Sequence, residues 1–427
     1  MLPMKEAVLA PGILLRAVQT TKFKNSLLSV TFLEPLTAEH AAQNALLPKV
    51  LRRGTQRYPD MTAFSAALDD LYGGGLEPIL RKKGEVQCVG FWASFLDDAF
   101  VPGHTPLLEQ AATLLGQVVL DPAGENGAFV PGYVDSEKEN LMRKIRSQVN
   151  DKLQYALSRL RTEMCRGEAY GLDKLGSEER AGAISGAGLY AHYRDLLETA
   201  PVCFYYCGSA EFERVEDAFR KAFAGLPQTK RQERPRTKVI DKPGPAVRRF
   251  QDRLDVTQGK LILGFRTGGG FRTMEEIAQG LLFNAVYGGT TNSKLFLNVR
   301  EKHSLCYFAN SSLAQNKGVM MVYSGVEFAN FARAEEEILT QLAACQRGEI
   351  TSDELETARR SVMGSLRTAL DAQGRLEEYW INRYVSDTRF APEELAQAVG
   401  EVRLDQVVQV ANRIQLDSVY TLQGKEG

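Results

Sequence analysis

The chain has 427 residues, of which 44% are hydrophobic and 25% charged, and its formal net charge is −1. This composition is typical of a globular protein with room for two or more domains, since each half, at roughly 210 residues, can bury a core of its own. The balanced charge excludes the basic field of a nucleic-acid-binding protein, so we expect no nucleic-acid partner.

The N-terminal 19 residues do not resemble a signal peptide, because Pro11 and Gly12 interrupt their apolar run. No stretch approaches the roughly 18 apolar residues that a membrane span needs, so we expect no membrane partner. Cys203 and Cys207 lie four residues apart on a predicted strand, which separates their Cα atoms by about 13 Å and prevents a disulfide. Free thiols fit a reducing compartment, and the sequence predicts a cytoplasmic protein.

In chain order, the first half predicts a strand at 27–33, a helix at 37–54, a strand at 85–95, a helix at 104–119, a long charged helix from 135 to about 166, and a strand ending at Gly208. A polar stretch at 228–245 contains three prolines and favours a domain boundary. The second half predicts strands at 260–265 and 318–326, a helix at 331–346, a long helix from 352 to about 373, and a strand ending at Gly424.

This repeated order of elements predicts an α+β fold with two duplicated domains, each an antiparallel-rich mixed sheet covered by helices. The predicted domains are 1–228 and 246–427, joined by a linker at 229–245. In the first domain, Thr37 is the expected N-cap of the helix at 37–54, and Gly54 the expected left-handed residue after it. The basic run 81–83 is interpreted as a solvated turn between strands.

The run 44–61, NALLPKVLRRGTQRYPDM, resembles the insulinase, pitrilysin and mitochondrial-processing-peptidase superfamily, whose domains form the two sides of a half-clam. In that family this helix carries H-x-x-E-H, which binds zinc. Counted back from the Gly-Thr pair, the motif positions are Ala45, Pro48 and Lys49. Positions i, i+3 and i+4 share one helix face, so they could meet one ion. A methyl group, a proline ring and an ammonium group cannot hold a metal ion. A proline inside a helix also costs about 3 kcal/mol and can kink the helix.

The family's third ligand is a glutamate on the long helix downstream. The resemblance places Lys144 at that position, with Glu137 and Glu139 one to two turns earlier. We therefore count Ala45, Pro48, Lys49 and Lys144 as degenerate metal positions, and expect this chain to bind no metal. The four histidines are never closer than 64 residues in sequence, and a metal site rebuilt from them is an alternative: His40, His104, His192 and His303.

The run 287–312 resembles the second half of the same family, where an Arg and a Tyr seven residues later hold substrate carbonyls and stabilise an oxyanion. Arg300 and Tyr307 reproduce that pair. Two plainer interpretations stay open: the Arg-Glu-Lys run as a solvated helix end, and Tyr307 as a strand aromatic that faces the core.

Resemblance over 169–197 and 353–371 extends to most of the chain. It implies a non-catalytic subunit of a heterodimeric zinc metallopeptidase, inactive alone. Zinc is expected in a homologous partner with an intact H-x-x-E-H, to whose site Arg300 and Tyr307 would contribute in processing peptides or unfolded polypeptides. Among family members, the chain is most similar to those associated with aminopentanol modification of elongation factor P. The alternatives are a scaffold or interaction protein without a role in proteolysis, and an enzyme with a different centre.

Overall fold

The computed structural model describes residues 3–101, 103, 105–228 and 231–425. The chain packs into two compact units, and each unit combines segments that are distant in sequence. Unit 1 comprises Met1–Arg146, Leu172–Arg236 and Ala372–Val385, and unit 2 comprises Ser147–Gly171, Thr237–Asp371 and Ser386–Gly427. Residues 231–247, within the polar stretch and just after it, form neither helix nor strand.

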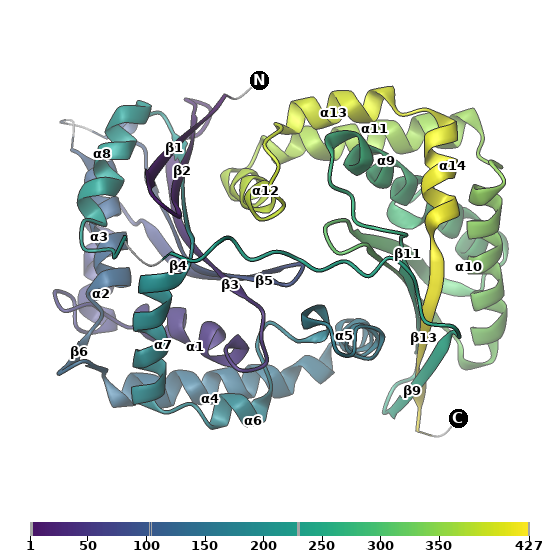
Figure 1. The fold of residues 1–427 in the computed structure, drawn as a ribbon, viewed down its shortest axis with the longest axis horizontal. Coiled ribbons are helices and arrows are strands. Elements are labelled where there is room, and N and C mark those ends of the chain that lie inside the picture. Colours follow the sequence, from purple (N-terminus) through teal and green to yellow (C-terminus); the bar gives the residue numbers. More distant parts are fainter. Residues whose placement is uncertain (1–2, 102, 104, 229–230, 426–427) are drawn as a thin grey trace. The chain divides into compact units, whose positions relative to one another are not determined.

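Unit 1 contains a six-stranded mixed sheet (Figure 1). Neighbouring strands are antiparallel except for the parallel pair β2 and β8. In spatial order the strands are β1 (Met4–Ala10), β2 (Ile13–Gln19), β8 (Val202–Gly208), β3 (Asn25–Pro35), β5 (Val86–Leu96) and β4 (Gly75–Lys83). A two-stranded hairpin is separate from it: β6 (Gly124–Glu125) and β7 (Ala128–Phe129).

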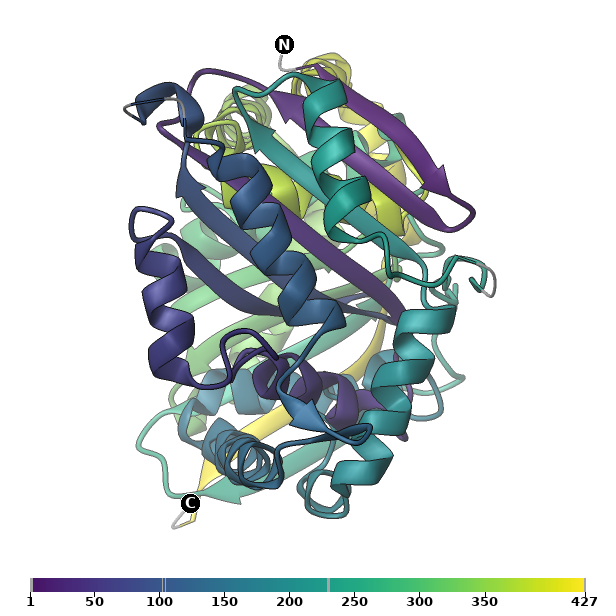
Figure 2. The same ribbon diagram turned by 90° about the vertical axis from the view of Figure 1, so that its left-hand side faces the viewer.

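Helices from both sequence halves cover the unit 1 sheet: α1 (Ala41–Leu51), α2 (Met61–Asp69), α3 (Leu107–Leu120), α4 (Pro131–Ser147), α6 (Glu178–Gly182), α7 (Gly186–Thr199), α8 (Phe212–Ala222) and α12 (Gln373–Val385). Side chains alternate across a strand, so β2, β8, β3 and β5 each contribute to two clusters. Leu28, Val30 and Phe32 of β3 pack in the main core with the helices of the first half, among them α3 and α8 (Figure 2). Leu33, on the opposite face, packs with Ile381 of α12.

Unit 2 contains a five-stranded sheet, in the order β11 (Cys306–Ala314), β12 (Val319–Val326), β10 (Gly259–Arg266), β13 (Gln415–Gly424) and β9 (Arg248–Leu254). Only β13 and β9 are parallel. Read from β9, this is the unit 1 order without β1, because the parallel pair of β9 and β13 corresponds to the parallel pair of β2 and β8. The α+β fold of two sheets covered by helices is therefore confirmed, and the shared topology supports duplication.

The helical elements of unit 2 are α5 (Lys152–Met164), α9 (Met274–Asn284), the π-helical η5 (Ala285–Gly289) and η6 (Leu295–Lys302), α10 (Phe331–Gln346), α11 (Ser352–Ala369), α13 (Pro392–Glu401) and α14 (Leu404–Arg413). The described residues also form short 3-10 turns: η1 (Asp98–Phe100), η3 (Gln148–Asn150), η4 (Ala169–Gly171) and η7 (Phe328–Asn330).

Helices α5 and α12 occupy equivalent places in the two halves, but each packs in the unit formed mainly by the other half. In unit 2, Leu160 and Met164 of α5 pack against Ile262 and Tyr420 of the sheet. A Cβ atom on Gly264 would lie 2.6 Å from the sulfur of Met164, so glycine permits this close approach. The two helices are thus exchanged between the halves.

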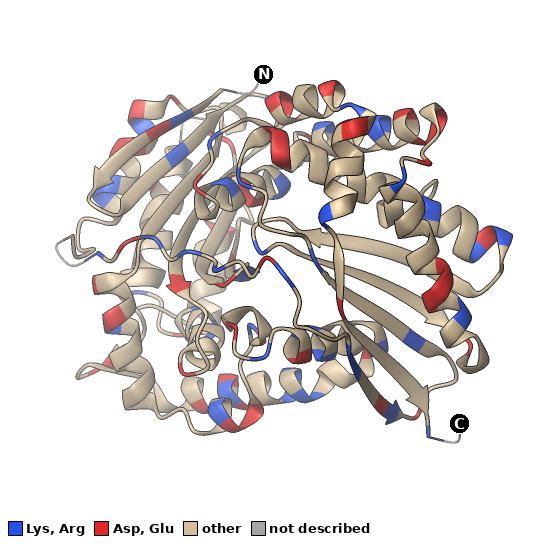
Figure 3. Ribbon diagram, turned by 45° about the vertical axis from the view of Figure 1, so that its right-hand side comes forward, with Lys and Arg blue, Asp and Glu red and all other residues tan. Residues whose placement is uncertain are grey.

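Two sequence predictions about helices are wrong. The single helix predicted from 135 to about 166 is two helices, because the 3-10 turn η3 interrupts it and Asp151 caps α5 by accepting a hydrogen bond from the backbone of Gln154. The helix predicted from 352 to about 373 ends at Ala369, and α12 begins at Gln373. Within the described ranges, no helix is both long and apolar enough to cross a bilayer. Acidic and basic residues are interspersed along the helices (Figure 3).

Candidate functional site

Helix α1 carries three of the degenerate metal positions. Ala45 is 2% exposed and packs in the main core, and Pro48 is buried inside the helix. Lys49, half-buried, is the one of these three side chains that has a charged group. None of the three supplies the imidazole or carboxylate that zinc requires.

The ends of α1 differ from the sequence prediction. The N-cap is His40 and not Thr37, whose hydroxyl instead accepts a hydrogen bond from the backbone of His40 at 3.1 Å in the turn before the helix. Gly54 is not in the left-handed region. Its Cβ atom would lie 2.7 Å from the carbonyl oxygen of Pro59, so this glycine serves a close approach of two backbone segments.

The structure brings Lys144 of α4 near Lys49 of α1. Burial lowers the pKa of Lys49, the positive charge of Lys144 lowers it further, and Glu137 opposes both. Glu137 is already paired with Arg53 at 2.9 Å. Lys49 thus lies near the cation of Lys144, and the nearby carboxylate of Glu137 is already paired with Arg53, which is unfavourable for a divalent metal ion.

A zinc centre of the family type does not fit this face of unit 1, since its donor set is a methyl group, a proline ring and two ammonium groups. Among the residues that the structure describes, no three His, Cys, Asp or Glu side chains gather as a metal-binding group. The side chains at these four positions are therefore apolar or cationic.

Arg300 lies in the π-helical segment η6 of unit 2. Its guanidinium carbon is 4.6 Å from the ring centre of Phe296, and its Nε is 3.5 Å from the carboxylate of Glu301. The side chain is 42% exposed. π-Helical segments are frequent at functional sites, and this eight-residue segment holds a charged group partly in solvent.

Tyr307 is the extra residue of a β-bulge at the start of β11. Cys306 pairs with Val326 and Phe308 pairs with Gly325, so no residue of β12 stands opposite Tyr307. Its side chain is 60% exposed, which makes the interpretation as a core aromatic wrong. Bulges next to active sites change the direction in which a side chain points. The spacing of residues in the sequence could not reveal this bulge, because the register between β11 and β12 depends on the tertiary structure.

Arg300 and Tyr307 belong to one connection in unit 2. The backbone amide of Ser304, which has a positive φ of 50°, donates to the carbonyl of Arg300 at 3.0 Å and ends η6. Strand β11 follows directly and is an edge strand, since it pairs with β12 alone. Along the chain, this connection therefore presents the cation of Arg300, the phenol hydroxyl of Tyr307 and the edge of β11.

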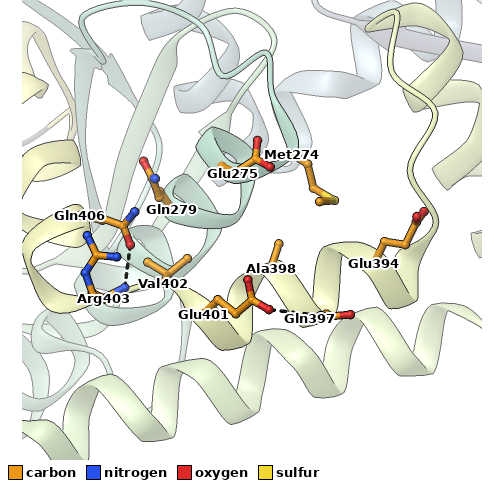
Figure 4. Close-up of a pocket in the computed structure, with 10 residues that line it drawn as sticks. All are labelled: Met274, Glu275, Gln279, Glu394, Gln397, Ala398, Glu401, Val402, Arg403 and Gln406. Carbon is orange, nitrogen blue, oxygen red and sulfur yellow. Dashed lines mark hydrogen bonds between the residues drawn. The ribbon is translucent and has the colours of Figure 1, made fainter.

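The structure also contains two hollows apart from these residues. One, of about 380 Å³, lies between α9, α13 and α14 in unit 2 and carries Glu275, Glu394 and Glu401 (Figure 4). Glu394 and Glu401 already accept hydrogen bonds from the backbone of Ala391 and the side chain of Gln397. The other, of about 620 Å³, lies between α2 and α3 in unit 1. Neither includes any predicted site residue.

Comparison with known proteins gives a consistent result. The family model described as Peptidase M16 inactive domain matches residues 183–362. The chain is 32% identical over 421 residues, 97% of each chain, to a Bacillus subtilis (strain 168) protein named "Probable inactive metalloprotease YmfF". It is 24% identical over 244 residues, 56% of this chain and 58% of the relative, to "Uncharacterized zinc protease YmxG" of the same organism.

A crystal structure of a conserved protein from Enterococcus faecalis V583 has the same fold, with a TM-score of 0.89 at 26% identity over 99% of both chains. Similarity of this extent agrees with the resemblance seen in both sequence halves. These comparisons show that the chain belongs to the M16 peptidase superfamily as an inactive member.

Proposed function

We propose that this chain is the non-catalytic subunit of a heterodimeric zinc peptidase. Its partner is a homologous subunit with an intact H-x-x-E-H, and this chain supplies Arg300 and Tyr307 to the partner's site. The observation that carries the proposal is the exposure of Tyr307 on its bulge, immediately after a segment that keeps Arg300 partly in solvent.

The chemistry of the pair suits peptide hydrolysis in trans. A guanidinium stacked on Phe296 is held in place while its remaining N–H groups can donate to peptide carbonyl oxygens. A phenol hydroxyl can donate to the oxyanion of a tetrahedral intermediate, which is the charge that develops during amide cleavage. Neither group needs a metal bound in this chain.

The edge position of β11 is an observation in favour of a substrate that binds in an extended conformation. A peptide that adds to a sheet edge gains backbone hydrogen bonds irrespective of its sequence, while side-chain pockets provide selectivity. The edge begins beside Tyr307, so a peptide paired there would lie against the hydroxyl. We therefore propose peptides or unfolded polypeptides as substrates.

A homologous partner is supported by the relatives. Bacillus subtilis (strain 168) holds both the relative named as inactive and the relative named as a zinc protease. A protein that has lost its zinc ligands but retains the exposed pair has a use for that pair only where another chain supplies the metal.

The proposal is tested by mixing the purified chain with an H-x-x-E-H homologue from the same genome and measuring cleavage of an unfolded polypeptide with and without a chelator. The mixture should be active, and neither subunit alone should match it. Tyr307→Phe should lower kcat/KM by about 100-fold or more, since it removes one oxyanion donor, and Arg300→Ala should lower it by a similar factor.

Arg249→Ala is the matched control, because Arg249 is an exposed arginine of unit 2 whose partner is Glu335. It should leave the rate unchanged. If the two chains associate but Arg300→Ala and Tyr307→Phe have no effect, the chain is a scaffold of the same fold and the proposed role in cleavage is refuted.

A further inference from the structure

Two histidines that are 152 residues apart in sequence meet in unit 1, next to the first turn of α1. The imidazole rings of His40 and His192 have centroids 4.8 Å apart and are tilted by 48°. His40 is the N-cap residue of α1, and His192 lies on α7. His192 is 6% exposed, whereas His40 is half-buried, so the pair is reached from solvent on the His40 side.

A chain of hydrogen bonds fixes which nitrogen of His192 carries its proton. The side-chain amide nitrogen of Gln87 faces the backbone carbonyls of Ala41 and Lys174, at 3.2 and 2.7 Å, and carbonyls can only accept. The oxygen of Gln87 therefore accepts from the amide nitrogen of Asn44 at 3.0 Å. This leaves the oxygen of Asn44 facing Nε2 of His192 at 2.7 Å. Nε2 must donate, so Nδ1 carries the lone pair.

The surroundings keep His192 neutral. Burial, with a further contribution from His40, lowers the pKa of His192 to about 4. In metal sites a ligating imidazole typically donates its other N–H to a fixed acceptor, which orients the ring. The contact between His192 and Asn44 is an arrangement of this kind, formed before any ion binds.

We propose that His40 and His192 form a transition-metal site for ions that prefer imidazole, such as Zn²⁺ and Ni²⁺. With metal–nitrogen distances of about 2.0–2.1 Å and a nearly tetrahedral angle, two ligating rings have centres roughly 5 Å apart, which the observed pair matches. The chain supplies two ligands, and water or a donor group of a bound molecule supplies the others. This site is separate from Ala45, Pro48 and Lys49, and it is independent of the proposed role of Arg300 and Tyr307.

The test is isothermal titration of the full chain, stripped with chelator, with Zn²⁺ alone and with Ni²⁺ alone. We expect one equivalent of either ion to bind, and His40→Ala to weaken binding at least tenfold. His40 is half-buried at a helix end, so this variant should fold. His303→Ala is the control, because it removes a histidine of unit 2 and should leave the affinity unchanged.

Nitrogen NMR of histidine-labelled protein gives a second readout. Zn²⁺ should shift Nδ1 of His192 while its Nε2 keeps the proton donated to Asn44. Absence of binding, or binding that His40→Ala does not weaken, would overturn the proposal and leave the two rings as a packing contact. Neither result bears on cleavage by the two-subunit peptidase, because that assay depends on unit 2 residues.

Discussion

A carboxylate oxygen of Glu377 lies 2.6 Å from the guanidinium of Arg81, although 296 residues separate them. The other oxygen accepts a hydrogen bond from the hydroxyl of Ser29 at 3.1 Å, and Glu377 is 1% exposed. The interpretation of residues 81–83 as a solvated turn is wrong: they lie in β4, and Lys83 pairs with the next glutamate of α12, Glu378. These two ion pairs attach the exchanged helix to the unit 1 sheet.

Removing that carboxylate should destabilise unit 1. Glu377→Ala leaves Arg81 and Ser29 without their buried partner, and we expect the free energy of unfolding to fall by about 3 kcal/mol. Urea denaturation measures the change. Glu335→Ala, which breaks a pair with the exposed Arg249, should cost about 1 kcal/mol or less. Equal losses in the two variants would show that burial of the Glu377 pair does not matter.

Asp97 should make stability depend on pH. Burial would raise its pKa, but hydrogen bonds from Ser209 and Ser26 and from backbone amides outweigh burial, and the pKa lies below the ordinary value of 3.8. A depressed carboxylate pKa stabilises the fold above the unfolded pKa of about 3.9, and the stabilisation is lost as the pH falls through the folded pKa.

We therefore expect Asp97→Asn to cost about 1–3 kcal/mol at pH 7, since Ser209 donates to Asp97 through both its hydroxyl and its backbone amide. The difference from the unaltered protein should shrink at pH 3. Denaturation at the two pH values checks this, and a cost independent of pH would contradict it.

Gly54→Ala tests the close approach that follows α1. The added Cβ would lie 2.7 Å from one backbone oxygen and 2.8 Å from another, of Pro59 and Tyr58, and backbone yields less readily than a side chain. We expect a loss of about 1–3 kcal/mol. Gly132→Ala, in α4 with open space around it, should be neutral or stabilising by about 0.5–1 kcal/mol. A melting temperature unchanged by Gly54→Ala would refute the steric reason.

The degenerate helix face can be tested by restoring it. A chain with Ala45→His, Pro48→Glu, Lys49→His and Lys144→Glu should bind one more zinc ion per molecule than the unaltered chain. The substitutions at positions 45, 49 and 144 then provide the family's three ligands, and the one at position 48 provides its general base. Elemental analysis after dialysis gives the stoichiometry. The same variant without Lys144→Glu is the control and should hold zinc more weakly. If it holds zinc equally well, Lys144 is not the third position.

The strands β3, β5, β8, β10, β12 and β13 and their repeated order could be predicted from the sequence, because apolar runs and closing glycines recur in both halves. The break between α4 and α5 was missed because both helices are charged and amphipathic, yet Asp151 was a visible capping signal. The identity of the sheet that α5 covers could not be predicted, since an apolar helix face does not specify which sheet it meets. The capping box of Thr351 and Glu354, by contrast, is a purely local signal for the start of α11.

The residues of the candidate site also divide into those that the sequence could indicate and those that only the structure could show. The family resemblance, counted back from the Gly-Thr pair, pointed to Ala45, Pro48 and Lys49, which lie at i, i+3 and i+4 of one helix. It could not show that Tyr307 is exposed, since the bulge depends on how β11 and β12 align. Nor could it show that His40 and His192 meet, because the two helices that carry them are brought together only by the core.

The exchange of α5 and α12 has a consequence for how such a chain can be divided. A polypeptide cut within residues 231–247 gives two fragments. The first carries α5, which packs in unit 2, and lacks α12. The second carries α12, which packs in unit 1, and lacks α5. Neither fragment is a self-sufficient product, and soluble protein should appear only when both are synthesised together. Each half of the chain therefore depends on the other for folding.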